Sequence, residues 1–570
     1  MRAVLTGLFA AAMLHLAACG EVEAPPPEPA RETARTLTGG DVVGHLAENG
    51  AQVWRNIPFA APPTGDLRWR APRPHPGWAG ERVSITPPER CPQVANALDQ
   101  GSDAEPGALL GAEDCLYLDV YAPAGAGPGD ADRPVMMWIH GGANVWGYAD
   151  QYDGSKLAAN EDVVVAVVQY RLGPLGFFAH PALREAGDDL RDRAANFALL
   201  DQIAALDWLA GNAAQFGGDA SNITIFGESA GGHNVAGLLA SPLAEGKFHR
   251  AIIQSGSLDT TPLALAEGSE GPDPNAAIPA AERMAGEDAG AADLRAASLQ
   301  AVYDAYGAGA DLRSMAPPRM IEDGVVLPEG GIRAALGEAG GFNAVPVITG
   351  VNRDEMKLFN ALDPELVTEV VGLFPRPRDR AYYNALAEYQ SRIWRVTAVD
   401  EAADLMTGAG HDAIWAYRFD WDEGGSFLFT DLSVLLGAAH AVEIPFVFDH
   451  FDFFGEFNDL LFNDANRDGR EALADAMGAY WGEFARTGDP GAAGGPEWTR
   501  WSGEGALMRF DSPGNGGWSM ITGGDSVSAI AEGIASDERL EPAERCAVVD
   551  GVIAYDPAYG ATLAARLGCA

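Results

Sequence analysis

Short apolar runs rich in valine and isoleucine recur along the chain, and longer segments with a helical pattern separate them. The runs are PVMMWIH (134–140), VVVAVVQYR (163–171), ITIF (223–226), AIIQSG (251–256), PVITGVN (346–352) and IWAYRF (414–419). Runs that are apolar on both faces are typical of parallel strands buried between two layers of helices. The segment LLDQIAALDWLAGN (199–212) carries apolar residues at helical spacing, as such a covering helix requires. The pattern therefore predicts an α/β fold with a large, mostly parallel central sheet and helices on both faces.

The rest of the chain shows no internal repeat and no second linker after residue 36. The segments 262–340 and 360–410 are less periodic, and we expect helical excursions above the sheet there. With 570 residues, of which 47% are hydrophobic, the chain is long enough to bury a large core. We therefore expect a single domain over residues 37–570.

The first residues have the pattern of an export signal. The run AVLTGLFAAAMLHL follows Met1 and Arg2, and its length is typical of a signal peptide, here residues 1–18. The run ends in LAAC, which resembles the bacterial lipobox that directs lipid attachment to the cysteine, here Cys19. The alternative is an ordinary secretory signal with a chance cysteine. We expect an exported protein, periplasmic or at the cell surface, that is lipid-anchored at Cys19 and continues in a Pro- and Glu-rich linker over residues 19–36.

The chain is strongly acidic. It has 81 acidic and 38 basic residues, which gives a formal net charge of −43. A field of this sign repels nucleic acid and anionic membranes, so we expect no nucleic-acid partner and membrane contact only through the lipid anchor. The basic residues are almost all arginine, since Lys156, Lys247 and Lys357 are the only lysines in the sequence.

Four cysteines remain if Cys19 carries lipid, and export permits them to form disulfides. Cys91 is close in sequence to Cys115, and Cys546 is close to Cys569. Pairing between these neighbours is the simplest of the three possible connectivities, and each bridge would stabilise the fold by roughly 3 kcal/mol. A metal site is the alternative, but no pair has C-x-x-C spacing, and we expect no bound metal.

A candidate nucleophile stands in the stretch ITIFGESAGGH (223–233). It contains G-x-S-x-G between an apolar strand and a small-residue helix start, with Ser229 at the turn. Such a turn exposes the serine Oγ, and glycines are needed on either side because side chains would clash with the neighbouring strand and helix. The alternative is a structural serine in a turn.

A nucleophilic serine needs donors for the oxyanion that forms on its substrate. The run PVMMWIH ends in His140 and continues with two glycines, which is the H-G-G type of loop whose N–H groups point into such a site. Gly141 and Gly142 are therefore candidate donors, joined by the N–H of Ala230 directly after the nucleophile. We interpret His140 as a support of the loop.

Together these residues resemble the type-B carboxylesterase/lipase family of α/β hydrolases, which includes carboxylesterases and cholinesterases. The resemblance extends from about residue 38 to residue 550 and rests on motifs in the same order along the chain. They are IPFAAPPTGDLRW (57–69), EDCLYLDVY (113–121), WIHGGA (138–143), YRLGPLGFF (170–178), NFALLDQIAALDW (196–208), FGGDASNITIFGESAGG (216–232), IIQSGS (252–257) and WGEFARTGDP (481–490). The resemblance implies the α/β-hydrolase fold, with helical excursions over an active-site gorge.

The resemblance also implies a Ser-Glu-His triad that cleaves small-molecule carboxylic esters through an acyl-enzyme, without a cofactor. The family's acid lies in a G-x-N-x-D-E segment, which here reads GVNRDE and gives Glu355. Its base lies in H-x-x-E-I-x-F, which here reads HAVEIPFVF and gives His440. The order Ser229, Glu355, His440 along the chain agrees with the order known for this fold.

Two further features bear on the substrate. Glu228, beside the nucleophile, would by resemblance lie at the base of the gorge, where it orders water or favours a cationic substrate group; the alternative is hydrogen bonding to nearby backbone. Cys91 and Cys115 correspond to a disulfide loop in which cholinesterases carry a tryptophan that binds the choline cation. That loop has no aromatic residue here, so choline-ester specificity is not expected.

Other functions remain open at this point. A catalytically silent homologue, acting in binding or adhesion, would have the same fold, and an acyltransferase or thioesterase would use the same triad. The segment DANRDGREALAD (464–475) imitates a calcium-binding loop but lacks the apolar residue and final glutamate of that motif. The alternative there is a helix start capped by Asp468.

Overall fold

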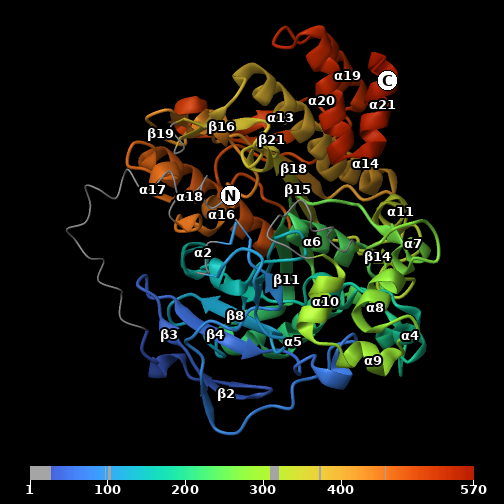
Figure 1. Ribbon diagram of the computed structural model, residues 1–570. Helices are drawn as coiled ribbons and strands as arrows, with labels where there is room; N and C mark the ends of the chain where they lie inside the picture. The colour runs from blue at the N-terminus through green and yellow to red at the C-terminus, as the bar shows by residue number, and fades with distance from the viewer. Residues whose placement is uncertain are drawn as a thin grey trace.

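An eleven-stranded sheet runs through the centre of the computed structural model (Figure 1). The structure describes residues 27–96, 98–99, 104–307, 320–370, 374–455 and 458–569. From one edge to the other the strands are β22 (Ser519–Ile521), β21 (Leu507–Phe510), β18 (Ile414–Phe419), β15 (Val347–Asn352), β12 (Arg250–Gln254), β11 (Gly218–Glu228), β9 (Arg133–Ile139), β10 (Val164–Val168), β8 (Tyr117–Ala122), β4 (Gln52–Pro58) and β3 (His45–Leu46).

The seven strands from β21 to β10 run parallel to one another. They include all six runs that the sequence pattern assigned to buried strands, now β9, β10, β11, β12, β15 and β18. Strands β8, β4 and β3 at one edge and β22 at the other pair antiparallel. The predicted mostly parallel sheet is confirmed. The antiparallel edge was not predicted, because a strand such as β8 interrupts its apolar run with Asp119.

Both faces of the sheet are covered by helices, because successive residues of a buried strand enter different cores. In β9, Met137 packs into one core and Trp138 into the other. The core around Met137 receives α5 (Phe197–Asn212), α6 (Ala230–Ala240) and α14 (Glu401–Gly408). The core around Trp138 receives α2 (Ser155–Glu161), α16 (Ile444–Phe448) and α18 (Arg467–Thr487). Helix α5 contains the predicted covering helix, which is thus confirmed.

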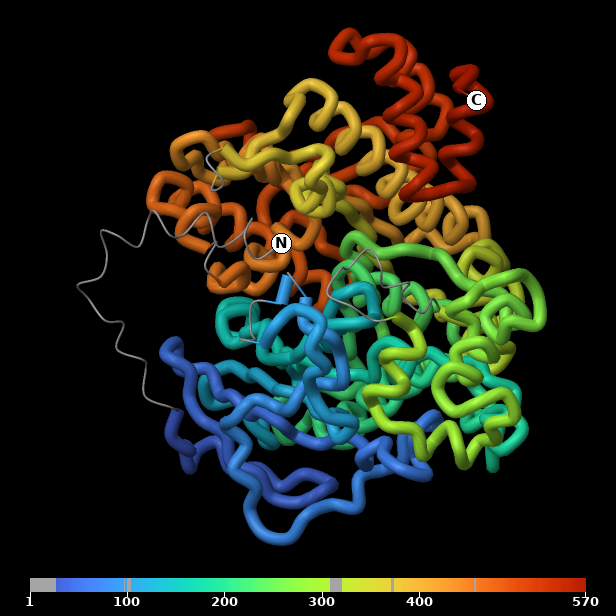
Figure 2. Tube along the Cα trace, in the orientation of Figure 1, coloured from blue at the N-terminus to red at the C-terminus, as the bar shows by residue number. Residues whose placement is uncertain are grey.

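The two helical excursions are also present. Between β12 and β15 the chain forms α7 (Leu263–Glu267), α8 (Ala277–Ala285), α9 (Ala291–Ala296), α10 (Leu299–Ala305) and α11 (Gly331–Gly337). Between β15 and β18 it forms α12 (Lys357–Asn360), α13 (Arg380–Arg395) and α14. The last helices, α19 (Val527–Ser536), α20 (Pro542–Tyr555) and α21 (Pro557–Leu567), share a third, smaller core with α13 (Figures 1 and 2).

Both disulfides join the cysteines that are neighbours in sequence, as the simplest connectivity predicted. One bridge is formed by Cys91 and Cys115, which are buried. The other links Cys546 in α20 to Cys569 beyond the end of α21, so it fastens the last two helices to each other.

The folded domain begins earlier than residue 37, the start that the sequence predicts. Arg35–Leu37 form β1, which pairs with β2 (Gly40–Val43). The Arg35 guanidinium donates to the side-chain oxygen of Gln52 on strand β4 at 2.6 Å. The end of the expected linker, residues 19–36, is therefore part of the fold, because these hydrogen bonds hold it against the sheet.

The predicted signal peptide, residues 1–18, and the lipid-bearing Cys19 lie outside the described residues. Among the helices of the described ranges, none combines the length and apolar composition needed to cross a membrane. The lipid anchor stays a prediction.

The calcium-like segment 464–475 is largely helical. Helix α18 begins at Arg467, with Asn466 at its N-cap and Asp468 in its first turn, where a negative charge favours the helix dipole. A calcium loop needs a non-helical course of about twelve residues to turn its ligands toward one ion. The helix start is confirmed, although Asp468 does not cap it. Within the described ranges, no group of three or more His, Cys, Asp or Glu side chains is arranged to hold a metal ion.

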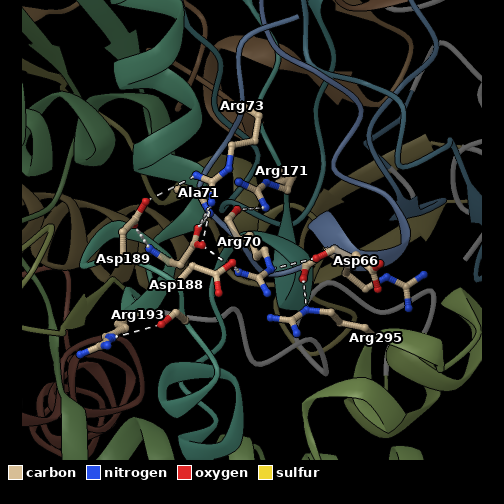
Figure 3. Close-up of polar contacts among 12 residues, drawn as sticks. Asp66, Arg70, Ala71, Arg73, Arg171, Asp188, Asp189, Arg193 and Arg295 are labelled. Atoms are coloured by element: carbon tan, nitrogen blue, oxygen red, sulfur yellow. Dashed lines mark hydrogen bonds and ion pairs between the residues drawn. The ribbon is translucent and has the colours of Figure 1, made fainter. Parts of the chain in front are cut away.

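A cluster of ion pairs fixes the loop around residues 66–73, at the end of one family motif, to the segment 188–193 (Figure 3). Asp192 is buried and accepts hydrogen bonds from Arg70 at 2.8 Å and Arg73 at 2.7 Å. Burial opposes the charged carboxylate, but these donors lower the pKa of Asp192. Arg70 and Arg73, directly after the motif, therefore serve the architecture around the sheet.

Candidate active site

Ser229 lies at a sharp turn between β11 and α6, as the sequence pattern predicted. Its backbone has φ +58° and ψ −122°, a conformation that residues other than glycine rarely adopt. Its N–H donates to the carbonyl of Gln254 on β12 at 2.9 Å. The strained turn leaves the serine partly exposed at the carboxyl end of a parallel strand, where open α/β sheets build their sites.

Gly227 and Gly231 flank the turn because the backbone leaves no room for side chains there. A Cβ on Gly227 would lie 2.6 Å from the carbonyl oxygen of Ile139 on β9. A Cβ on Gly231 would lie 1.9 Å from the same oxygen and 2.9 Å from that of His140. The G-x-S-x-G motif is thus a packing requirement, since α6 approaches β9 at backbone distance.

Glu355 and His440 form a buried pair. Nδ1 of His440 lies 2.5 Å from Oε2 of Glu355. The other oxygen, Oε1, accepts hydrogen bonds from the Ser255 hydroxyl at 2.5 Å and from the Asn352 N–H at 2.7 Å. With both oxygens engaged, Glu355 is held in one orientation and can fix the imidazole proton on Nδ1.

Glu228 approaches the opposite side of the imidazole. Its Oε1 is buried and lies 3.1 Å from Nε2 of His440, although the alignment does not make a hydrogen bond. This oxygen accepts no hydrogen bond from any described residue, so the alternative of bonding to nearby backbone is not found for it.

These buried charges set the protonation of the imidazole. Burial raises the pKa of the Glu228 carboxyl well above its usual value, while the charge of His440 opposes the shift. Burial lowers the pKa of His440, but the carboxylates of Glu228 and Glu355 outweigh it and raise this pKa to about 9. The groups therefore titrate together, and a protonated Glu228 favours the neutral imidazole that a general base must be.

The hydroxyl of Ser229 makes no hydrogen bond with another described residue. His440 contacts Glu228, which directly precedes the serine in the chain, so the imidazole lies near the turn that carries Ser229. In unliganded enzymes the bond between nucleophile and base is often long and tightens on binding. The structure thus brings Ser229, Glu355 and His440, far apart in sequence, to one place.

The loop after β9 reaches the same place. Gly141 is so near that a Cβ on it would lie 3.1 Å from the Cβ of Ser229. Burial raises the pKa of the Tyr152 hydroxyl well above its usual value, the charge of Glu228 adds to this, and the Gly141 N–H, directed at the phenolic oxygen, opposes it. The Gly141 N–H therefore lies near the phenolic oxygen of Tyr152.

Three other N–H groups in this region donate to no acceptor among the described residues. They belong to Gly142 and Ala143 in the loop and to Ala230, the first residue of α6. Gly142 has φ +93° and Ala143 has φ +53°, so the loop backbone is turned into the left-handed region at both positions. Free N–H groups at a loop and a helix N-terminus form a place that favours negative charge.

His140 supports this loop, in agreement with its interpretation from the sequence. Its buried ring stacks on Tyr170 with centroids 4.5 Å apart, and its carbonyl accepts a hydrogen bond from the Tyr170 hydroxyl at 2.7 Å. Burial lowers the pKa of His140 to about 4, so the ring is neutral at physiological pH. His140 therefore has a packing role and is not a proton carrier at physiological pH.

Two residues beside His440 were missed in the sequence. Glu443 is buried and accepts hydrogen bonds from two amide side chains, and burial together with the charge of Glu355 raises its pKa to about 7. Its position in HAVEIPFVF was the available signal. Trp394 of α13 lies over the imidazole with centroids 4.7 Å apart. No local pattern marks Trp394, because the contact joins distant segments.

Comparison with known proteins agrees with this geometry. The profile described as "Carboxylesterase family" matches residues 30–371 and 364–520. The chain belongs to the carboxylesterase family. Human cocaine esterase is 33% identical over 511 residues, which cover 81% of this carboxylesterase and 85% of the human protein. The para-nitrobenzyl esterase of Bacillus subtilis is 32% identical over 484 residues, which cover 80% of this chain and 90% of that protein.

Solved structures extend the likeness to three dimensions. A Geobacillus stearothermophilus carboxylesterase aligns with a TM-score of 0.67 and 30% identity, over 88% of this chain and 99% of that one. The expected α/β-hydrolase fold is confirmed, and the protein is a serine hydrolase that cleaves carboxylic esters. Neither a silent homologue nor an acyltransferase or thioesterase is favoured by these carboxylesterase relatives.

Replacing Gly231 by alanine tests the backbone contact under the turn. The added methyl would overlap the Ile139 carbonyl, so we expect a loss of stability of about 1–3 kcal/mol or more together with a large loss of esterase activity. Denaturant unfolding and ester turnover measure both. Gly408→Ala is the matched control, because nothing lies within 4 Å of its added Cβ. Equal stability of Gly231→Ala and Gly408→Ala would contradict the proposed contact.

Replacing Glu228 by glutamine tests its charge. Because the carboxylate raises the pKa of His440, its removal should lower that pKa and move the acidic limb of kcat/KM to lower pH, by on the order of one pH unit. The active, neutral imidazole then persists into more acidic solution. A pH–rate profile of wild type and Glu228→Gln measures the shift. An unmoved limb would mean that Glu228 carries no charge while the enzyme works.

Proposed function

We propose that this carboxylesterase acts on a small-molecule ester with Ser229 as nucleophile, His440 as general base and Glu355 as the residue that orients the imidazole. The observation that carries the proposal is the 2.5 Å contact between Nδ1 of His440 and Oε2 of Glu355, beside a serine with a strained backbone. A carboxylate that holds the proton on Nδ1 leaves Nε2 free to accept the serine proton.

The reaction proceeds in two halves. His440 takes the proton of Ser229 as the serine oxygen attacks the ester carbonyl, which creates a tetrahedral oxyanion. The intermediate collapses, the alcohol leaves with the proton from the imidazolium, and the acyl group stays on the serine. A water molecule then attacks in the same way and releases the acid. Glu355 keeps its contact with Nδ1 and stabilises the imidazolium throughout.

The oxyanion is held in this proposal by the N–H groups of Gly142, Ala143 and Ala230. From the sequence we expect Gly141 and Gly142 with Ala230. Ala143 replaces Gly141 here because its N–H is unengaged, whereas the Gly141 N–H is directed at Tyr152. Donors fixed in a buried site stabilise the developing charge, and each typically contributes a factor of roughly a hundred or more to the rate.

Glu228 has two compatible roles in this mechanism. As a neutral acid it leaves the imidazole free to act as a base, and as a carboxylate it attracts a cationic group on the substrate. Because burial and the neighbouring carboxylates raise its pKa, the preference for a cationic ester should grow with pH.

Replacing Ser229 by alanine tests the central assignment. Without the nucleophile no acyl-enzyme forms, and we expect ester turnover to fall on the order of 10⁴-fold or more. The measurement is the burst and steady release of nitrophenol from p-nitrophenyl esters, with labelling by a fluorophosphonate probe. Ser221→Ala, on an exposed position of β11, is the control and should behave as wild type. Equal turnover by Ser229→Ala and wild type would overturn the assignment.

We also propose that Cys19 carries lipid and holds the carboxylesterase at a membrane after export. The support is the LAAC sequence at the end of the apolar leader and the Pro-rich segment that follows it. Acyl chains on one cysteine are sufficient to retain a hydrophilic domain, since each buried CH₂ contributes about 0.8 kcal/mol.

Replacing Cys19 by serine should release the protein from the membrane. We expect wild type in the detergent-rich phase of a Triton X-114 separation and Cys19→Ser in the aqueous phase, with unchanged ester turnover because the proposed catalytic residues are far from Cys19 in the sequence. Mass spectrometry of the N-terminal peptide identifies the lipid. Equal partition of both proteins into the aqueous phase would refute the anchor.

A further inference from the structure

A polar cavity of about 570 Å³ lies behind the loop that carries Glu355. Its wall is built from that loop, from one face of α13, which lies close to the end of β15 in Figure 1, and from residues before and after α19. Neither Ser229 nor His440 lines it. The cavity is therefore distinct from the proposed active site, although one loop serves both.

Cationic side chains outnumber carboxylates in the cavity wall, whereas acidic residues outnumber basic ones in the whole protein. Seven cationic side chains and four carboxylates line the cavity, whereas the whole chain has 38 basic and 81 acidic residues. Each of the four carboxylates already pairs with an arginine. Arg395 and Arg418 pair with carboxylates that do not line the cavity, and Arg539 pairs with one that does and one that does not. Lys357 shares Asp354 with Arg353, and Arg380 has no ion pair among the described residues.

Lys357 is unusual in this chain. It is one of three lysines, and its residue is only 6% exposed. Its ammonium lies 3.3 Å from one oxygen of Asp354 and makes no hydrogen bond with any other described residue. An ammonium has three donors, so the Lys357 ammonium has capacity for further acceptors. An acceptor inside the cavity would satisfy the remaining donors.

Other polar groups of the cavity wall, several donors and one acceptor, also lack hydrogen-bond partners among the described residues. Arg380, in the first turn of α13, has neither an ion pair nor a side-chain hydrogen bond within the described chain. Asn384, one turn later and also in the wall, has a buried side-chain oxygen without a partner. Arg353 and Arg418 bind their carboxylates through Nε and Nη2. The other terminal nitrogen of each guanidinium, Nη1, donates to no described residue and can bind a ligand.

We propose that this cavity binds a small oxyanion with at least two negative charges, of the phosphate or polycarboxylate class. Guanidinium groups match the oxygens of such anions in fork geometry, and a partly enclosed ammonium adds a point charge. The volume is in the range of ligand pockets and exceeds that of a single phosphate group, so an organic phosphate or a polycarboxylate also has room.

The cavity also touches the loop that leads to His440. Asp354, the ion-pair partner of Lys357, accepts a hydrogen bond from the N–H of Ala438 at 3.1 Å. Ala438 stands two residues before His440. A bound anion would therefore share Lys357 with Asp354, whose carboxylate joins the loop that carries Glu355 to the loop that leads to His440.

Direct binding tests the proposal without any need for turnover. Isothermal titration calorimetry uses the full-length protein with inorganic phosphate and, separately, with citrate, at a constant ionic strength set by chloride. We expect saturable binding of at least one of these anions, with one site per chain. Arg380→Gln and Lys357→Met should each weaken it about tenfold or more, because each removes a charged donor. Lys156→Gln, an exposed lysine outside the cavity, is the control and should bind as wild type.

The proposal is overturned if neither anion binds saturably to wild type, or if Arg380→Gln binds as tightly as wild type. Arg380 is exposed and has no described partner, so its replacement does not threaten folding. Circular dichroism checks Lys357→Met, and if that buried variant does not fold, Arg380→Gln decides alone. Ser229→Ala should retain anion binding, which separates this site from the esterase assignment.

Discussion

The active site depends on one interaction, the contact of a buried imidazole with carboxylates on both of its nitrogens. Nδ1 of His440 meets Glu355 at 2.5 Å and Nε2 meets Glu228 at 3.1 Å. An unpaired charge would be costly at a site from which water is largely excluded. The surrounding hydrogen bonds therefore hold the His440–Glu355 pair in place. Ser255 and the Asn352 backbone fix Glu355, and this fixes the ring. The proton balance of the whole group then decides when the imidazole can act.

Backbone contacts make this arrangement possible. The sheet supplies the ends of β11, β12 and β15 side by side, and each end carries part of the site. Gly227 and Gly231 let α6 approach β9 at backbone distance, which forces Ser229 into its positive φ. The same approach brings the Gly142 loop beside the serine. A small number of glycines therefore sets the position of nucleophile and donors together.

Much of this could be predicted from the sequence. The buried parallel strands were visible because they are apolar on both faces, and the proposed triad residues because each stands in a motif of the family. Three features could not be predicted from the sequence: the antiparallel edge strands, the early start of the fold at Arg35–Leu37, and the contact of Trp394 with His440. Each depends on pairing or packing between distant segments, which leaves no periodic pattern of hydrophobic residues in the sequence. The cavity around Lys357 likewise exists only once α13 folds back over β15.

In the proposed mechanism the acyl group passes through Ser229. The most direct test is to quench the enzyme in acid during turnover of a p-nitrophenyl ester, digest it, and map the acyl adduct by mass spectrometry. We expect one acyl group per chain on the peptide that contains Ser229. An adduct on a different residue, or no adduct while the alcohol is released in a burst, would contradict it.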